Sequence, residues 1–184
     1  MRLVLASASP RRRELLGLLG HDFDVVVPAV EELSDGDPAE LVAENARRKA
    51  LAGAELAPGA TVIGADTDVA VDGRLLGKPG DEPAARERLE LLSGRTHDVL
   101  SGVAIAGHGA PRVEVETTSV AFRELTPDDI DRYLASGEWR DRAGGYAVQG
   151  LGSALVERID GDLSNVIGLP IPLLSRMIAE LQNG

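Results

Sequence analysis

The sequence lacks cysteine altogether, which excludes disulfide bonds and thiolate metal sites. Aromatic residues are also scarce, since two Phe, two Tyr and one Trp make up 3% of the 184 residues. Single-stranded RNA is usually bound by stacking its bases on aromatic side chains, so this composition disfavours an RNA-binding module. No apolar run approaches the roughly 20 residues that cross a bilayer. We therefore expect a cytoplasmic protein that does not bind a membrane.

Positive charge is the next scarcity. The 30 acidic residues outnumber the 19 basic residues and give a formal net charge of -11. Nucleic-acid binding needs a basic face that displaces counterions, so we expect no nucleic-acid partner. An anionic ligand would instead be held by a few placed cations. Among the basic residues only Lys49 and Lys78 are lysines, which suggests two positions that require a compact ammonium group.

The pattern of apolar residues, prolines and glycines predicts an α/β fold. Strands and helices alternate early in the chain, whereas two long strands form an antiparallel hairpin later, so we expect a mixed sheet. No linker or repeat divides the chain, which predicts a single domain over residues 1–184. We expect strands at 2–6, 22–27, 60–65, 96–106, 112–123 and 154–160, a hairpin at 69–76, a glycine-rich loop at 142–152, and helices at 10–20, 38–57, 81–92, 127–135 and 170–181.

A cationic segment, SASPRR, lies where the first predicted strand passes into a helix. Free backbone N–H groups and the helix dipole favour an anion at such a junction. The hydroxyl of Ser7 and the guanidinium groups of Arg11 and Arg12 are suited to phosphate oxygens. A serine-capped helix start with solvated arginines explains the same residues equally well.

Two acidic segments could carry chemistry. Asp66 follows the predicted strand 60–65 directly, and a carboxylate at a strand end can bind Mg²⁺ or act as a general base. An Asp that caps a tight turn is the commoner case at such a position. Glu32 belongs to a second acidic cluster, which could equally be a solvated loop. Each of these signals is weak when taken alone.

Three further segments have a functional and an ordinary interpretation. Lys49 lies in the helical run ENARRK, where an ion-paired surface face is the simpler explanation. Lys78 lies between Gly77 and Pro79, which restrain its backbone. Gln149 supplies an amide to the glycine-rich loop, where it could read a base edge or belong to a turn. His97 alternates with apolar neighbours, which favours a structural role.

In their order and spacing these motifs resemble the Maf family of nucleoside triphosphate pyrophosphatases, also called septum-formation inhibitor proteins. The resemblance covers nearly the whole chain and implies a mixed, elongated, twisted sheet flanked by helices, as in inosine triphosphatases. It also implies two lobes around a central nucleotide-binding cleft. The motifs that carry it are LASASPRR, VEE, ENARRKA, GADT, LLGKP, LSGRTHDVLSGVAI, AGGYAVQGLG and GDLSNVIGLP.

The resemblance implies cleavage of a nucleoside triphosphate between its α- and β-phosphates, with Mg²⁺ or Mn²⁺. Asp66 would be the proton acceptor for the attacking water, and Glu32 would be its partner in holding either the metal or the water. Cationic side chains would stabilise the charge on the leaving pyrophosphate. The implied triphosphate ligands are Ser7, Arg12, Lys49 and Lys78.

The resemblance also distinguishes branches of the family. Arg11, Thr67 and Gln149 match the branch that acts on dTTP and UTP, whereas the 7-methyl-GTP branch has Trp after Ser-Pro and Glu in place of Gln. Asp68 departs from the Ile or Val that the family usually has. In a continuing strand Asp68 would share a side with Asp66, where it could raise the pKa of the base, bind metal or face solvent.

Two expectations concern partners and alternatives. The long hairpin offers a surface on which two copies could pair, so a homodimer is one expectation. The alternative function is a regulator of cell division that binds a nucleotide without turnover, although a pure binder has no need of a placed base such as Asp66.

Overall fold

The computed structural model describes residues 1–107 and 109–183, with side chains up to residue 181. The predicted turn at 107–111 includes His108, which lies outside the described residues. The strands are β1 (Leu3–Ala6), β2 (Phe23–Val26), β3 (Thr61–Val71), β4 (Arg74–Leu75), β5 (Thr96–Ala106), β6 (Arg112–Phe122) and β7 (Val156–Asp160). The helices are α1 (Pro10–Gly17), α2 (Pro38–Leu56), α3 (Glu82–Leu92), α4 (Pro127–Ser136), α5 (Leu163–Ile167) and α6 (Ile171–Asn183), with 3₁₀ turns η1 (Ala143–Gly145) and η2 (Gly150–Leu155).

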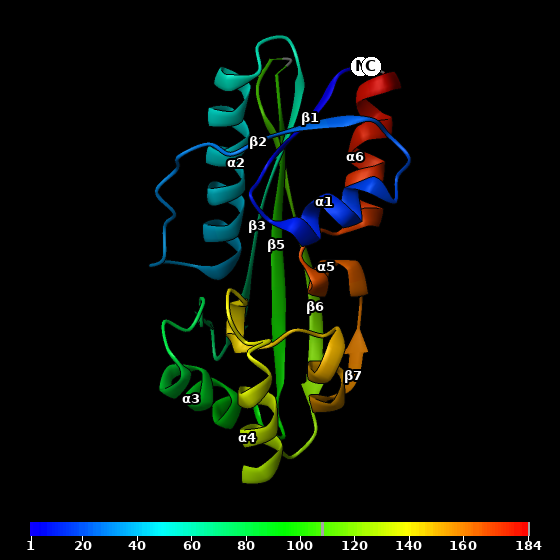
Figure 1. Ribbon diagram of the computed structural model, residues 1–184. Coiled ribbons are helices and arrows are strands. Elements are labelled where there is room, and N and C mark those ends of the chain that lie inside the picture. The colour runs from blue at the N-terminus through cyan, green and yellow to red at the C-terminus, as the bar shows by residue number, and fades with distance from the viewer. Residues whose placement is uncertain (108, 184) are drawn as a thin grey trace.

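The described residues form one seven-stranded mixed sheet in the order β2-β1-β3-β5-β6-β7, with β4 paired to β3. β1 runs parallel to β2 and β3, and the other pairs are antiparallel. β3, β5 and β6 have 11 residues each, so the sheet is long and narrow (Figure 1). These observations confirm the predicted α/β class with a mixed, elongated sheet flanked by helices.

Helices cover the two faces of the upper part of the sheet. Because side chains alternate along a strand, Leu3 and Leu5 pack in a core with α1 and α6, whereas Val4 and Ala6 face the side of α2. A separate core below contains residues of α3, α4 and the far ends of β3, β5 and β6 (Figure 1). No helix among the described residues has the length and apolar character needed to cross a membrane.

Two glycines allow α2 to lie close against the sheet. A β-carbon on Gly102 would lie 2.1 Å from the carbonyl oxygen of Val42, and one on Gly64 would lie 2.4 Å from that of Ala46. Any larger side chain would therefore push α2 away from β3 and β5. This close approach brings one face of α2 over the middle of β3.

The structure differs from the sequence prediction along β3. The predicted strand ended at residue 65, yet β3 continues to Val71, so Asp66 lies within the strand and not at its end. The cause is the partner strand, since β5 pairs with β3 from Val62 to Ala70 and Asp66 lies opposite Gly102. Asp66 and Asp68 consequently project from the same face, as expected for a continuing strand.

Smaller differences concern two short elements. α1 ends at Gly17, earlier than predicted, because the N–H groups of residues 18 and 19 bond to carbonyls three residues back and tighten the last turn. The sequence analysis also missed α5, a single short turn capped by the carboxylate of Asp162. The carbonyl of Gly168, just after α5, becomes important for the site.

Candidate active site

Three adjoining hollows form a cleft at the waist of the molecule. Arg12 and Lys78 line all three, so the hollows are parts of one cleft. The serine hollow contains residues 6–12 and has a volume of about 430 Å³. The carboxylate hollow contains Glu32, Asp66 and Asp68 and also measures about 430 Å³. The inner hollow, of about 100 Å³, lies against the 141–149 segment.

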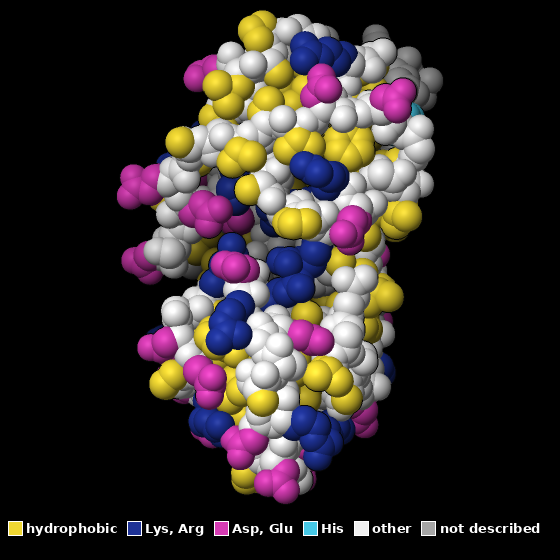
Figure 2. Space-filling model, in the orientation of Figure 1, with side chains coloured by type: hydrophobic (Ala, Val, Ile, Leu, Met, Phe, Trp, Pro, Cys, Tyr) yellow, Lys and Arg dark blue, Asp and Glu magenta, His cyan; other side chains and the backbone are white. Residues whose placement is uncertain are grey.

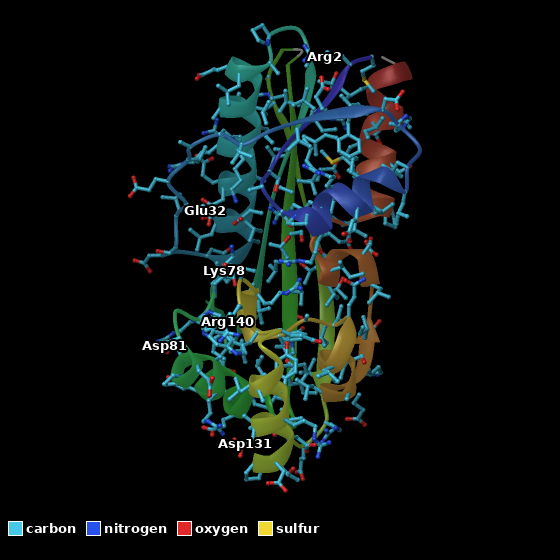
Figure 3. All side chains as sticks on the ribbon, viewed as in Figure 1. Arg2, Glu32, Lys78, Asp81, Asp131 and Arg140 are labelled. Atoms are coloured by element: carbon cyan, nitrogen blue, oxygen red, sulfur yellow. The ribbon has the colours of Figure 1, made fainter. Side chains whose placement is uncertain are left out.

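The charge of the cleft differs from that of the whole chain. Five cations and four carboxylates line the three hollows, although the protein carries a net charge of -11. Figure 2 shows Lys and Arg side chains gathered around the waist, with acidic side chains beside them. Glu32 reaches the cleft from the loop above and Lys78 from the loop below (Figure 3). Positive charge is therefore local, as an acidic protein needs if it is to bind an anion.

Lys49 and two carboxylates form the centre of the carboxylate hollow. The Lys49 Nζ lies 2.7 Å from Asp66 Oδ1 and 2.5 Å from Glu32 Oε1. The side chains of Lys49 and Asp66 are 13% and 14% exposed, which strengthens their attraction relative to a surface pair. Lys49 does not join the ion pairs on its own helix, where Arg47 and Arg48 both bind Glu44. The structure thus brings together three of the predicted site residues.

Asn45 is a site residue that the sequence analysis missed. Its Nδ2 donates to Asp66 Oδ2 and to the carbonyl of Leu33, each at 3.0 Å, and its Oδ1 accepts from the N–H of Leu33 at 2.8 Å. Asn45 is 2% exposed. It therefore holds the carboxylate of Asp66 and fixes the backbone next to Glu32. A polar amide inside ENARRK, one helical turn before Lys49, was the available signal.

Arg12 is held by neutral groups from three parts of the chain. Its Nε donates to the carbonyl of Gly168 at 2.9 Å, and its Nη2 donates to Thr67 Oγ1 at 3.2 Å. Ser7 Oγ accepts from Arg12 Nη1 at 3.5 Å. Burial lowers the pKa of Arg12, and the charges of Asp66 and Glu32 oppose that shift. No carboxylate among the described residues forms an ion pair with Arg12, so its charge is available to an anion.

Thr67 lines the cleft and also helps to hold Arg12 in position. Its Oγ1 donates to the carbonyl of Gly168 at 3.1 Å and shares a 2.7 Å hydrogen bond with Ser101 Oγ. Ser9, which lies beside Ser7, caps α1 through its hydroxyl, as the serine-capped interpretation of this segment expected. The serine cap is therefore present, whereas the partly buried Arg12 is not the solvated arginine of that interpretation.

Arg11 and Gln149 both line the inner hollow. Arg11 Nη2 donates to the carbonyl of Asp141 at 3.2 Å and so links α1 to the segment before η1. Burial and the nearby Arg142 and Arg12 lower the pKa of Arg11 to about 10. Gln149 is exposed, lines the inner hollow and forms no side-chain hydrogen bond with the described residues.

Lys78 and Asp68 lie where the lower part of the chain meets the cleft. Lys78 is exposed and forms no ion pair with a described carboxylate. Asp68 Oδ1 accepts from the N–H of Val69 at 2.7 Å and of Gly77 at 2.9 Å. Burial, helped by Asp66, raises the pKa of Asp68 to about 6, while the two hydrogen bonds and Arg88 oppose that shift.

His97 lines none of the three cleft hollows. It is 2% exposed, its Nε2 lies 2.8 Å from the hydroxyl of Tyr146, and its ring packs edge-on against Phe122. Burial lowers its pKa to about 4, so the ring is neutral at neutral pH. A structural role, as the sequence suggested, fits this placement.

The carboxylate pair fits a divalent cation that arrives with phosphate oxygens. Glu32 and Asp66 contact the same ammonium nitrogen, so their oxygens lie within reach of one small ion. Mg²⁺ is commonly held by one or two carboxylates together with substrate phosphates and water. In the described part of the chain, no group of three or more acidic or histidine side chains could hold an ion.

Fold and site together define an α/β protein whose cleft combines anion-binding cations, hydroxyls and a carboxylate pair. The family described as Maf-like protein matches residues 2–181, and the chain belongs to this family.

Relatives support the same assignment. A protein of Deinococcus radiodurans named dTTP/UTP pyrophosphatase is 47% identical over 178 residues, which are 96% of this chain and 91% of the relative. Proteins of the same name from Bacillus cereus and Bacillus anthracis are each 46% identical over 183 residues, or 98% of this chain and 94% of the relative.

Proposed function

We propose that this protein hydrolyses dTTP and UTP to the nucleoside monophosphate and pyrophosphate. The observation that carries the proposal is the position of Asp66, a carboxylate held by Lys49 and Asn45 inside a cleft that also presents Arg12 and Lys78. The name of the relatives supports the substrate class. A binding protein needs the cations, but it does not need a fixed carboxylate among them.

Asp66 is the group that accepts a proton from the attacking water. Lys49 contacts its Oδ1 and Asn45 its Oδ2, and each carboxylate oxygen keeps a further lone pair for that proton. A carboxylate is a weak base toward water at neutral pH. When bound, Mg²⁺ or Mn²⁺ would make the attacking water easier to deprotonate, because a divalent ion lowers the pKa of water, and it would also screen the phosphate charge. Glu32 and Asp66 are the residues that would hold it.

The cations bind the triphosphate and stabilise the leaving pyrophosphate. Phosphoryl transfer depends mainly on positioning and on charge stabilisation, so fixed cations are worth more than mobile ones. Arg12 is fixed by three hydrogen bonds and Lys49 by two carboxylates. Ser7, beside Arg12 in the serine hollow, adds a hydroxyl donor for a phosphate oxygen.

The base binds in the inner hollow. Gln149 has a free amide there, whose donor and acceptor can pair with the edge of a pyrimidine. Arg11 and Thr67 border the same hollow and set its size through their bonds to Asp141 and Gly168. These three residues are therefore the proposed determinants of specificity.

The organisation of the enzyme follows from the position of the cleft. We infer that residues 1–184 act as a single domain. Glu32 lies above the cleft and Lys78 below it (Figure 3), so the upper and lower lobes that carry them would enclose the substrate. A substrate pool of free nucleotides agrees with action in the cytoplasm. A homodimer through the β5–β6 hairpin stays a prediction.

A panel of nucleotides tests the proposed substrate. Pyrophosphate release with Mg²⁺ or Mn²⁺ is measured for dTTP, UTP, CTP, GTP, ITP and 7-methyl-GTP. We expect the highest kcat/KM for dTTP and UTP, and a fall for both in the Gln149→Glu variant. A preference for 7-methyl-GTP would assign the chain to the other branch, and no pyrophosphate from any nucleotide would support the non-catalytic regulator.

A further inference from the structure

The peptide groups around Gly77 are held from three elements. The N–H of Gly77 donates to Asp68 Oδ1 on β3 at 2.9 Å. Its carbonyl accepts from Arg88 Nη1 on α3 at 2.7 Å and from the N–H of Gly144 in η1 at 2.9 Å. The turn therefore has a fixed place between β3, α3 and η1.

The fixed turn determines where Lys78 starts. Gly77 has a φ of 59°, a left-handed conformation that favours glycine, and Pro79 restricts the other side of Lys78. The ammonium of Lys78 has no described carboxylate to anchor it, and yet Lys78 lines all three hollows of the cleft. Its position thus depends on the backbone of the turn and not on a partner of its side chain.

Asp68 contributes to this arrangement through one oxygen. Its Oδ1 accepts from both Val69 and Gly77, so this oxygen is already occupied by protein donors. Arg88 forms no ion pair with Asp68; the two side chains meet instead through the Gly77 peptide, which lies between them.

We propose that Asp68 and Arg88 are positioning residues: their hydrogen bonds hold the Gly77 peptide in place and thereby direct the Lys78 ammonium toward the pyrophosphate end of the substrate. This proposal rests on the phosphate-binding role of Lys78 stated above. It assigns Asp68 a hydrogen-bonding task and excludes it from the groups that touch substrate or metal.

The comparison of Asp68→Ala with Asp68→Asn separates hydrogen bonding from charge. Asn keeps an oxygen that accepts from Gly77, whereas Ala removes it. A small misplacement of a catalytic group can cost about 100-fold in rate. We expect kcat/KM for dTTP to fall about 10- to 100-fold in Asp68→Ala, and to stay close to the wild-type value in Asp68→Asn. An equal loss in both variants overturns the proposal, because it would show that the charge itself acts on substrate or metal.

Arg88→Met removes the hydrogen bond to the Gly77 carbonyl, and it keeps the proposal testable if Asp68→Ala does not fold. Arg86→Met is the matched control, since Arg86 lies on the same helix and pairs with Asp131 at the surface. We expect Arg88→Met to lower kcat/KM as Asp68→Ala does, and Arg86→Met to leave it unchanged. If the two arginine variants have equal kcat/KM, the proposed positioning role of Arg88 is contradicted.

A double-mutant cycle with Lys78→Ala shows whether the effect passes through Lys78. If Asp68 acts only by aiming Lys78, Asp68→Ala causes no further loss once Lys78 is Ala. The same factor in both backgrounds overturns the proposal. Affinity for α,β-imido-dTTP, measured by calorimetry, gives the same cycle without turnover. If the wild type binds this analogue but releases no pyrophosphate from dTTP, the proposed function fails, while the positioning role of Asp68 and Arg88 is still judged from the affinities.

Discussion

Replacing Asn45 by Ala should damage stability and catalysis together, because this one side chain connects Asp66 with the backbone beside Glu32. The variant loses three hydrogen bonds, two to Leu33 and one to Asp66. Each typical intramolecular hydrogen bond contributes about 1 kcal/mol net. The expected loss is therefore about 3 kcal/mol in the free energy of unfolding. For a domain of this size that loss corresponds to a fall in Tm of about 6–12 °C.

The catalytic effect has a different origin. Without the Asn45 amide, the Asp66 carboxylate can turn away and the loop that carries Glu32 is released. We expect kcat for dTTP to fall about 10-fold or more, since misplacement of the general base directly reduces its contribution. Asn45→Asp should be worse than Asn45→Ala, because a second carboxylate would lie about where the amide now meets Asp66 Oδ2.

The control is a variant that loses comparable stability far from the cleft. Met177→Ala removes a fully buried side chain of α6 from the core that contains Leu16 and Leu174, at a typical cost of about 2–5 kcal/mol. Urea unfolding gives the stability of both variants, and pyrophosphate release below their transition temperatures gives the activity. If Asn45→Ala keeps the kcat of Met177→Ala, the positioning role of Asn45 is refuted.

Three further predictions follow from the packing. Burial lowers the pKa of His97 from 6.5 to about 4, so the unfolded chain binds a proton that the folded chain refuses, and stability falls as the pH drops through this window. Between pH 7 and pH 5 the free energy of unfolding falls by about 2 kcal/mol because of His97. Urea unfolding of the wild type and of His97→Gln tests this, and the same pH dependence in both proteins would contradict it. Gly102→Ala places a β-carbon 2.1 Å from a carbonyl oxygen of α2, so calorimetry should show a strongly reduced Tm, whereas Gly17→Ala, which meets no atom within 4 Å, should show none. Glu138 accepts hydrogen bonds from the N–H groups of residues 151 and 152, beside Gln149. Glu138→Ala should therefore raise the KM for dTTP more than it lowers kcat. Unchanged kinetics would show that Glu138 does not help to position the residues that bind the nucleobase.

Local sequence signals predicted the elements well. The helices predicted to begin at Pro38 and Pro127 begin at these residues in the structure as α2 and α4. The strands predicted at 96–106 and 112–123 match β5 and β6 to within one residue. Elements whose stability depends on neighbours in the chain are the ones that a sequence reveals.

Non-local contacts account for what the sequence did not reveal. The extension of β3 past residue 65 depends on pairing with β5, whose partner residues lie 28 to 36 positions later in the chain, from Ala70↔Asp98 to Asp66↔Gly102. Asn45 joins partners 12 residues before it and 21 residues after it, so no local pattern marks its role. The contact of Lys49 with Asp66 likewise requires α2 to lie directly on the sheet, which the small residues Gly64 and Gly102 permit.

The resemblance to the family supplied most of the candidate site, and physical chemistry explains how the fold assembles it. The predicted residues meet in one cleft. They come from the 7–12 segment, the loop that carries Glu32, α2, β3, the turn at 77–79 and the 141–149 segment. Thr67 illustrates what remained hidden: its hydroxyl holds Arg12 and Gly168 in place, a task that spacing in the sequence could not show.

The most direct test of the account is the product formed from dTTP by the wild type and by Asp66→Asn. Phosphorus NMR of the reaction with Mg²⁺ should show dTMP and pyrophosphate for the wild type. General-base catalysis typically contributes about 10²- to 10⁴-fold, so Asp66→Asn should lose activity by such a factor while its Tm shows that it is folded. Formation of dTDP and inorganic phosphate by the wild type, or undiminished turnover by folded Asp66→Asn, would contradict the account.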